Sequence, residues 1–159
     1  MISNEENLKN AGILLPEIPS AAGLYQPAVR IGDLIYTSGQ LPLVGGKLME
    51  PGGRGRVSEA YEQEATKAAR VAALNAVAVL RSVTGNLDTV ARIVKLTIYV
   101  SSADGFTNQH KVANGASELV YEIFGESGRH VRVAVGVLAL PLDASVEVEM
   151  IAYCPLIRY

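Results

Sequence analysis

The chain has 159 residues, 49% of them apolar, which is enough for one domain with a sizeable core. Its net charge of −2 lacks the basic footprint of nucleic-acid-binding proteins, so nucleic acid is not an expected partner. No stretch reaches the roughly 18 apolar residues of a membrane span, and the acidic N-terminus is unlike a signal peptide. The single cysteine, Cys154, excludes an internal disulfide and fits a reducing compartment, so we expect a cytoplasmic protein.

We expect a single domain over residues 1–159, of which residues 1–20 form an N-terminal arm. Alternation of apolar and polar residues, bounded by turn residues, predicts a series of strands. These strands are 24–29, 33–38, 47–49, 93–101, 131–138 and 145–153. The strand at 47–49 lies in a glycine-rich loop, 45–55, to which the sequence assigns no role.

Two helices are predicted between these strands. The first begins after Ser58, a good N-cap, and ends at Gly85-Asn86. Its apolar stripe consists mostly of alanine: Ala65, Ala69, Ala72, Ala76, Val79 and Val83. The helix can therefore lie very close to the surface that it covers. The second helix begins near Asp104 and stops at Gly125. The order of elements predicts an α+β fold, a single sheet with both helices packed on one face.

The face of the sheet that the helices leave uncovered is chemically mixed. In the last strand, Val146 and its alternate residues are apolar, whereas the other face carries Glu147, Glu149, Ile151 and Tyr153. A solvated face would be more polar and a monomer core less so. This composition indicates an oligomer interface that contains a polar site.

Arg132 is the strongest candidate for a functional residue. It lies in mid-strand, and the next two positions on its face, Ala134 and Gly136, have almost no side chain. A guanidinium there is costly to desolvate without an anionic partner or an opening to water. Its planar fork of donors suits a carboxylate, although a structural ion pair with Glu147 or Glu149 across an interface is the alternative.

Several segments carry a resemblance to a known family. They are Gly23-Leu24-Tyr25, residues 36–42 (Tyr-Thr-Ser-Gly-Gln-Leu-Pro), and the region from Arg132 through Leu140-Pro141 to residues 146–149 (Val-Glu-Val-Glu). In these the chain resembles the reactive intermediate deaminase (Rid) family, also called YjgF-like or "endoribonuclease L-PSP", over about residues 22–153. The resemblance implies a chorismate-mutase-like fold, a homotrimer with ligand clefts between subunits, and hydrolysis of 2-imino acids or enamines without a cofactor. The two histidines lie far apart in the sequence, so no metal site is expected.

The resemblance also implies roles for individual residues. Arg132 matches the arginine that binds the substrate carboxylate, and Glu147 matches the glutamate near the imine and water. Tyr25, Ser38 and Gly39 match substrate-binding positions of the cleft. The chain departs from the family where Val133 and Ala134 replace a frequent Ser-Cys pair, and where residues 106–132 and the glycine-rich loop are longer.

Three function classes follow from these observations. The first is hydrolytic deamination of imines or enamines, with Arg132 and Glu147 as catalytic residues and a 2-imino or 2-oxo acid as the small carboxylate ligand. The second is a trimer that binds a small carboxylate without catalysis. The third is an endoribonuclease, against which the acidic chain argues. His130, close to Arg132, is a weak further candidate, whereas His110 is expected to be packed or capped.

Overall fold

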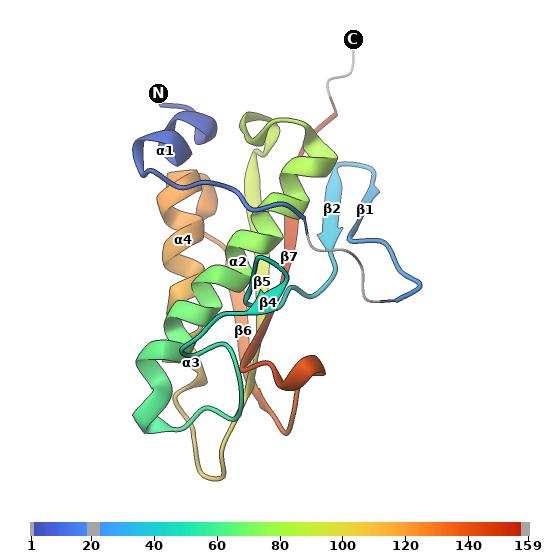
Figure 1. Ribbon diagram of the computed structural model, residues 1–159. Coiled ribbons are helices and arrows are strands. Elements are labelled where there is room, and N and C mark those ends of the chain that lie inside the picture. Colours follow the sequence, from blue (N-terminus) through green and yellow to red (C-terminus); the bar gives the residue numbers. More distant parts are fainter. Residues whose placement is uncertain (1, 19–22, 157–159) are drawn as a thin grey trace.

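The computed structural model describes residues 2–18 and 23–156. Its centre is a five-stranded mixed sheet with the strand order β1-β2-β7-β5-β6 (Figure 1). The strands are β1 (Ala28–Ile31), β2 (Leu34–Thr37), β5 (Arg92–Ser101), β6 (Val131–Val137) and β7 (Val146–Tyr153). Only β5 and β6 pair in parallel, and β6 forms one edge of the sheet.

Two helices cover one face of this sheet, as the sequence predicts. They are α2 (Glu62–Thr84) and α4 (Asn114–Phe124), which lie side by side in Figure 1. The predicted second helix is interrupted at Ala113, because a short α3 (Gln109–Val112) precedes α4. None of the described helices is both long and apolar enough to cross a membrane.

The alanine-rich stripe of α2 allows the close packing that the sequence predicts. Ala65, Ala69, Ala72 and Ala76 are fully buried, and only Val83 at the end of the stripe is exposed. The approach to α4 is so close that a Cβ atom on Gly115 would lie 2.9 Å from the carbonyl carbon of Thr66. The two helices therefore pack backbone to backbone at this point.

The alternation predicted for β7 is confirmed, because Val146, Val148, Met150 and Ala152 all face the core. In strand 93–101 the same alternation predicts that Val94, Leu96, Ile98 and Val100 face the helices and that Ile93 faces the open side; for the start of β5 this prediction is wrong. Ile93 is fully buried opposite Ala152, and the pairing then skips Val94. This β-bulge at Val94 returns Leu96 to the core face.

The first hairpin is displaced from its prediction. The strand expected over 24–29 begins only at Ala28, and residues 23–27 form an irregular segment before it. β1 and β2 are joined by Gly32 and Asp33, where Gly32 has a positive φ. Within the glycine-rich loop, β3 (Leu43–Val44) pairs with β4 (Lys47–Leu48), close to the predicted short strand.

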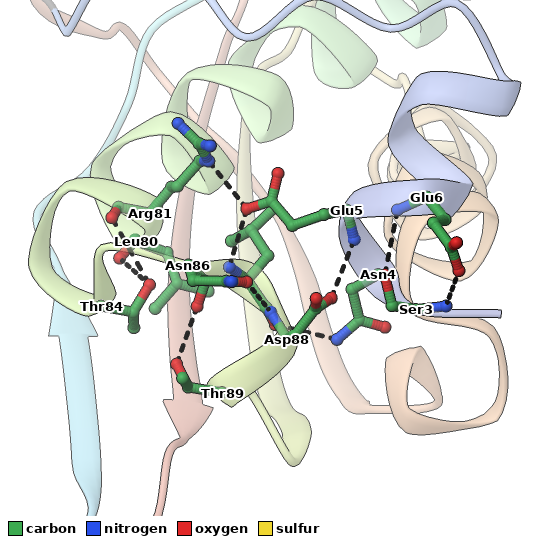
Figure 2. A network of polar contacts seen from close by, with 11 residues as sticks. Ser3, Asn4, Glu5, Glu6, Leu80, Arg81, Thr84, Asn86, Asp88 and Thr89 are labelled. Atoms are coloured by element: carbon green, nitrogen blue, oxygen red, sulfur yellow. Dashed lines mark hydrogen bonds and ion pairs between the residues drawn. The ribbon is translucent and has the colours of Figure 1, made fainter. Parts of the chain in front are cut away.

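The expected N-terminal arm contains a helix that the sequence analysis missed. The Ser3 hydroxyl caps α1 (Asn4–Asn10) by accepting from the Glu6 amide, and the Glu6 carboxylate accepts from the Ser3 amide. Figure 2 shows how Glu5 then accepts from Arg81 Nε at 2.8 Å. The arm is therefore attached to the end of α2 rather than extended in solvent, although residues 1, 19 and 20 of it lie outside the described residues.

Short 3-10 turns complete the chain: Glu59–Tyr61, Leu87–Thr89, Gly125–Gly128 and Pro141–Asp143. The third of these turns leads from α4 into β6. It therefore sets the position of the residues that begin β6, which carry the candidate site.

Candidate functional site

Arg132 lies on the helix-covered face of the edge strand β6. It pairs with Leu96, a core residue, and its guanidinium reaches α3 and α4. Nη1 donates to Asn114 Oδ1 at 2.9 Å and to Ser117 Oγ at 3.1 Å. Nη2 donates to the backbone carbonyl of His110 at 3.0 Å. Three of the five guanidinium N–H groups are thus held by neutral acceptors, which fixes the plane of the fork.

The positive charge of Arg132 has no acidic partner among the described residues. The side chain is half-buried, and this burial lowers the pKa of the guanidinium. Neutral hydrogen bonds orient a cation but do not neutralise it. A half-buried arginine in this condition favours binding of an anion from solution.

A groove of about 470 Å³ lies beside the guanidinium, between α4 and the start of β6. Its lining consists of Ser117, Tyr121, Gly128, Arg129, His130 and Arg132. His130 Nε2 lies 3.0 Å from Ser117 Oγ, and Nδ1 lies 2.6 Å from the Gly128 carbonyl oxygen. Burial lowers the pKa of His130, and the nearby charge of Arg132 lowers it further, although the Gly128 carbonyl acts in the opposite direction.

The small residues Ala134 and Gly136 on the same face as Arg132 predict an opening beside them, but the opening lies elsewhere. The space left by Gly136 is occupied, because a Cβ atom there would lie 2.8 Å from Gln109 Nε2 and 3.0 Å from Ser102 Oγ. The groove instead lies toward the other end of the strand, beside His130. His110 also departs from its prediction: its side chain is exposed, and only its carbonyl takes part.

Three other predicted residues come together on the opposite, open face of the sheet. Glu147 on β7 packs directly against Gly39, where a Cβ atom would lie 2.7 Å from the Glu147 carboxyl carbon. Gln40 pairs with Val148, which holds the segment of Ser38 and Gly39 against β7. Burial raises the pKa of Glu147, and the charge of Glu149 raises it further. Glu147 is therefore suited to holding a proton.

Tyr25 lies next to this group in the irregular segment before β1. Ser38 Oγ donates to the Gln26 carbonyl at 2.6 Å, and the Ser38 amide donates to the Pro27 carbonyl. The tyrosine side chain is 50% exposed. Ser38 therefore ties the segment of Tyr25 to the segment of Gly39, in addition to any role toward a ligand.

Within one chain, Arg132 and Glu147 do not share a site. They lie on opposite faces of the sheet, and β5 separates β6 from β7. Within one chain Arg132 therefore forms no ion pair with Glu147 or Glu149; the predicted ion pair lies across an interface between chains, and it stays a prediction. Glu149 instead accepts from the Tyr99 hydroxyl at 3.4 Å.

The open face is apolar at its β6 edge. Val131, Val133 and Val135 are 65%, 41% and 39% exposed, and Tyr36 and Tyr153 are exposed farther along the same face. Exposed apolar side chains that gather at one edge of a sheet face are typical of a protein–protein interface. Over residues 2–18 and 23–156, no group of three or more His, Cys, Asp or Glu side chains could hold a metal ion.

Comparisons with known proteins agree with this architecture. The profile of a family described as "YjgF/chorismate mutase-like, putative endoribonuclease" matches residues 5–154. The chain belongs to the YjgF/chorismate mutase-like family. Protein TCP17 of Trypanosoma cruzi is 44% identical over 146 residues, 90% of this chain and 89% of that protein.

Two solved structures resemble the chain closely. A protein of unknown function from Agrobacterium tumefaciens, Atu1372, is 38% identical with a TM-score of 0.84, and the match covers 95% of this chain and 92% of that one. A protein from Shewanella oneidensis, called a "putative endoribonuclease", is 35% identical with a TM-score of 0.89, covering 95% and 99%. The likeness extends over nearly the whole chain, which confirms the family assignment made from the motifs.

Proposed function

We propose that this YjgF-like protein binds a small 2-imino acid and hydrolyses it to a 2-oxo acid and ammonia, in a cleft that two subunits of a homotrimer share. The observation that carries the proposal is Arg132, a half-buried guanidinium held by three neutral acceptors and lacking an acidic partner among the described residues. Such a group binds the carboxylate that 2-imino and 2-oxo acids have in common.

The composite cleft follows from the separation of the two catalytic candidates. Arg132 of one chain would face Glu147, Ser38, Gly39 and Tyr25 of a neighbour, because no single chain brings the two groups together. The exposed valines of β6 supply an apolar surface for such an assembly. Light scattering at micromolar concentration should show a trimer. A stable monomer would remove the shared cleft and with it this function.

The chemistry requires a proton at the imine nitrogen and a water molecule at the adjacent carbon. Glu147, whose pKa is raised by burial, can donate a proton to the nitrogen as water adds to the carbon. The resulting carboxylate takes a proton from the added water, which leaves a carbinolamine, and then returns this proton to the nitrogen. As the C–N bond breaks, the remaining hydroxyl proton passes to the Glu147 carboxylate, so ammonia leaves, the 2-oxo acid remains and Glu147 is protonated again. Arg132 holds the substrate carboxylate throughout, and the reaction needs mainly positioning.

Single-turnover ammonia release from 2-iminopropanoate, measured beside a titration with pyruvate, tests this function. Glu147→Gln should lower turnover by about 100-fold, the low end for a general acid–base group, and leave pyruvate binding nearly intact. Glu149→Gln is the matched control, since this acid lies two residues along the same face and bonds to Tyr99. Arg132→Lys keeps the charge but loses the fork, so it should weaken pyruvate binding by at least about 1 kcal/mol.

The same preparation distinguishes the other functions. Pyruvate binding without any wild-type turnover would favour a trimer that binds a carboxylate without catalysis. Unchanged turnover in Glu147→Gln with weakened binding would assign Glu147 a structural role. Equal affinity of the wild type and Arg132→Lys would place the carboxylate elsewhere. Cleavage of single-stranded RNA, which we do not expect from an acidic chain, would favour the endoribonuclease.

A further inference from the structure

The groove beside Arg132 contains a chain of hydrogen bonds whose direction can be worked out. A carbonyl oxygen only accepts, so the bond to the Gly128 carbonyl places a proton on His130 Nδ1. In the neutral ring, Nε2 must then be an acceptor. The Ser117 hydroxyl therefore donates to Nε2, while its oxygen accepts from Arg132 Nη1.

In this state the hydroxyl proton of Ser117 is directed at the histidine and not at the groove. Protonation of His130 reverses the bond, because both ring nitrogens then donate. Ser117 Oγ would accept from Arg132 and from His130 with its two lone pairs. Its own O–H would be released, and the side chain lines the groove where it could meet an anion.

We propose that Ser117 and His130 extend the anion site of Arg132, so that a small carboxylate binds in the groove with uptake of a proton by His130. The ligand receives N–H donors from Arg132 and the O–H donor of Ser117. This inference rests on the proposed function for the identity of the ligand. It adds a ligand-binding serine and a positioning histidine that sets the direction of its hydroxyl.

The charges around His130 determine whether binding of the carboxylate favours or opposes protonation of the ring. On β6 and the turn before it, Arg132 and Arg129 are cationic, and Arg129 is paired with Glu126 at 2.8 Å. From α4, Tyr121 is the ionisable group in the groove. From β5, Lys95 pairs with Val131 and so faces away, on the open side of the sheet.

Burial of the ring opposes its protonation, and the nearby charge of Arg132 adds to this effect. A bound carboxylate offsets the positive charge and favours the imidazolium. By linkage, the ligand must then bind more tightly at acidic pH. Affinity should rise as the pH falls through the pKa of His130 in the complex, and level off once the free protein, in which this pKa is lowered, is also protonated.

Calorimetric titration of the intact protein with pyruvate between pH 5.5 and 8, in two buffers of different ionisation enthalpy, measures this uptake. The wild type should take up a substantial fraction of one proton per site over the part of this pH range in which its affinity changes. Ser117→Ala should weaken binding by about 2- to 10-fold at pH 5.5 and have a smaller effect at pH 8. His130→Gln should abolish the proton uptake.

Two variants serve as matched controls. His110→Gln removes the other histidine of the chain but keeps the backbone carbonyl that binds Arg132, so proton uptake should persist. Asn114→Ala removes another acceptor of Arg132 Nη1 without touching the histidine, so it should weaken binding equally at every pH. NMR titration of His130 in the wild type, with and without pyruvate, gives the same answer should a variant fail to fold.

The outcomes separate this inference from the proposed function. Pyruvate binding that is independent of pH, with an unchanged His130 titration, overturns the inference and leaves deamination possible. Proton-coupled binding without ammonia release supports the inference and overturns deamination. No pyruvate binding between pH 5.5 and 8 overturns both.

Discussion

Gly39 offers a direct test of Glu147, because the two residues are in contact. A Cβ atom on Gly39 would lie 2.7 Å from the carboxyl carbon of Glu147 and 3.0 Å from its Cγ. Carbon atoms prefer a separation of about 3.5–4.0 Å, so Gly39→Ala must displace the carboxylate by about 1 Å. The φ of Gly39 lies outside the left-handed region, so the backbone itself accepts alanine.

The carboxylate is the end of a flexible side chain, so the protein should fold with a loss of less than about 1 kcal/mol. Turnover should nevertheless fall by about 100-fold, the penalty typical of a 1 Å misplacement. Gly115→Ala provides the contrast. There the obstacle is the backbone of α2, and we expect about 1–3 kcal/mol of destabilisation despite the better helix propensity of alanine.

Both variants are compared by denaturant unfolding and by single-turnover ammonia release. Adding Glu147→Asp to Gly39→Ala shortens the displaced side chain and should recover part of the turnover. If Gly39→Ala folds and retains wild-type turnover, the position of the Glu147 carboxylate does not matter to the reaction. The reasoning that makes it the proton donor would then be refuted.

Three further predictions concern stability. Because the pKa of Glu147 is raised in the folded state, Glu147→Gln should raise the melting temperature at neutral pH, and this gain should vanish as the pH falls below the unfolded pKa. Because the pKa of His130 is lowered in the folded state, its neutral form favours folding at high pH. The wild type should therefore lose stability as the pH falls below about 6.5, the pKa of an unfolded histidine, and His130→Gln should lose less. Ser3→Ala removes the cap of α1 and should destabilise the protein by about 1 kcal/mol in urea unfolding, with faster hydrogen exchange in α1.

The sequence predicted the faces of the sheet well wherever the strand was regular. Alternation in β7 assigned every core residue, because a two-residue period is a local property of extended backbone. It failed at the start of β5, where the bulge at Val94 shifts the period by one residue. The signal for α1 was present, since Ser3 and Glu6 have the spacing of a capping box, but it was not used.

The candidate site was only partly predictable for a different reason. Arg132 could be selected because a charge in mid-strand is unusual in any fold. Its partners could not, since Asn114 and Ser117 reach it only through the packing of α4 on the sheet. His130 was identified as a candidate by proximity in sequence alone. Its pairing with Ser117, 13 residues away, depends on the turn that leads into β6.

The separation of Arg132 and Glu147 makes subunit sharing open to a direct measurement. If each cleft takes Arg132 from one chain and Glu147 from its neighbour, every mixed trimer of Arg132→Lys and Glu147→Gln chains contains one cleft with both natural residues. Random refolding of an equal mixture yields mixed trimers in about three quarters of cases, so about a quarter of the wild-type turnover should return. Each variant refolded alone supplies the baseline. If both groups acted within the same subunit, no combination of the two chains would restore an intact cleft, and the mixture would show only the average of its parts.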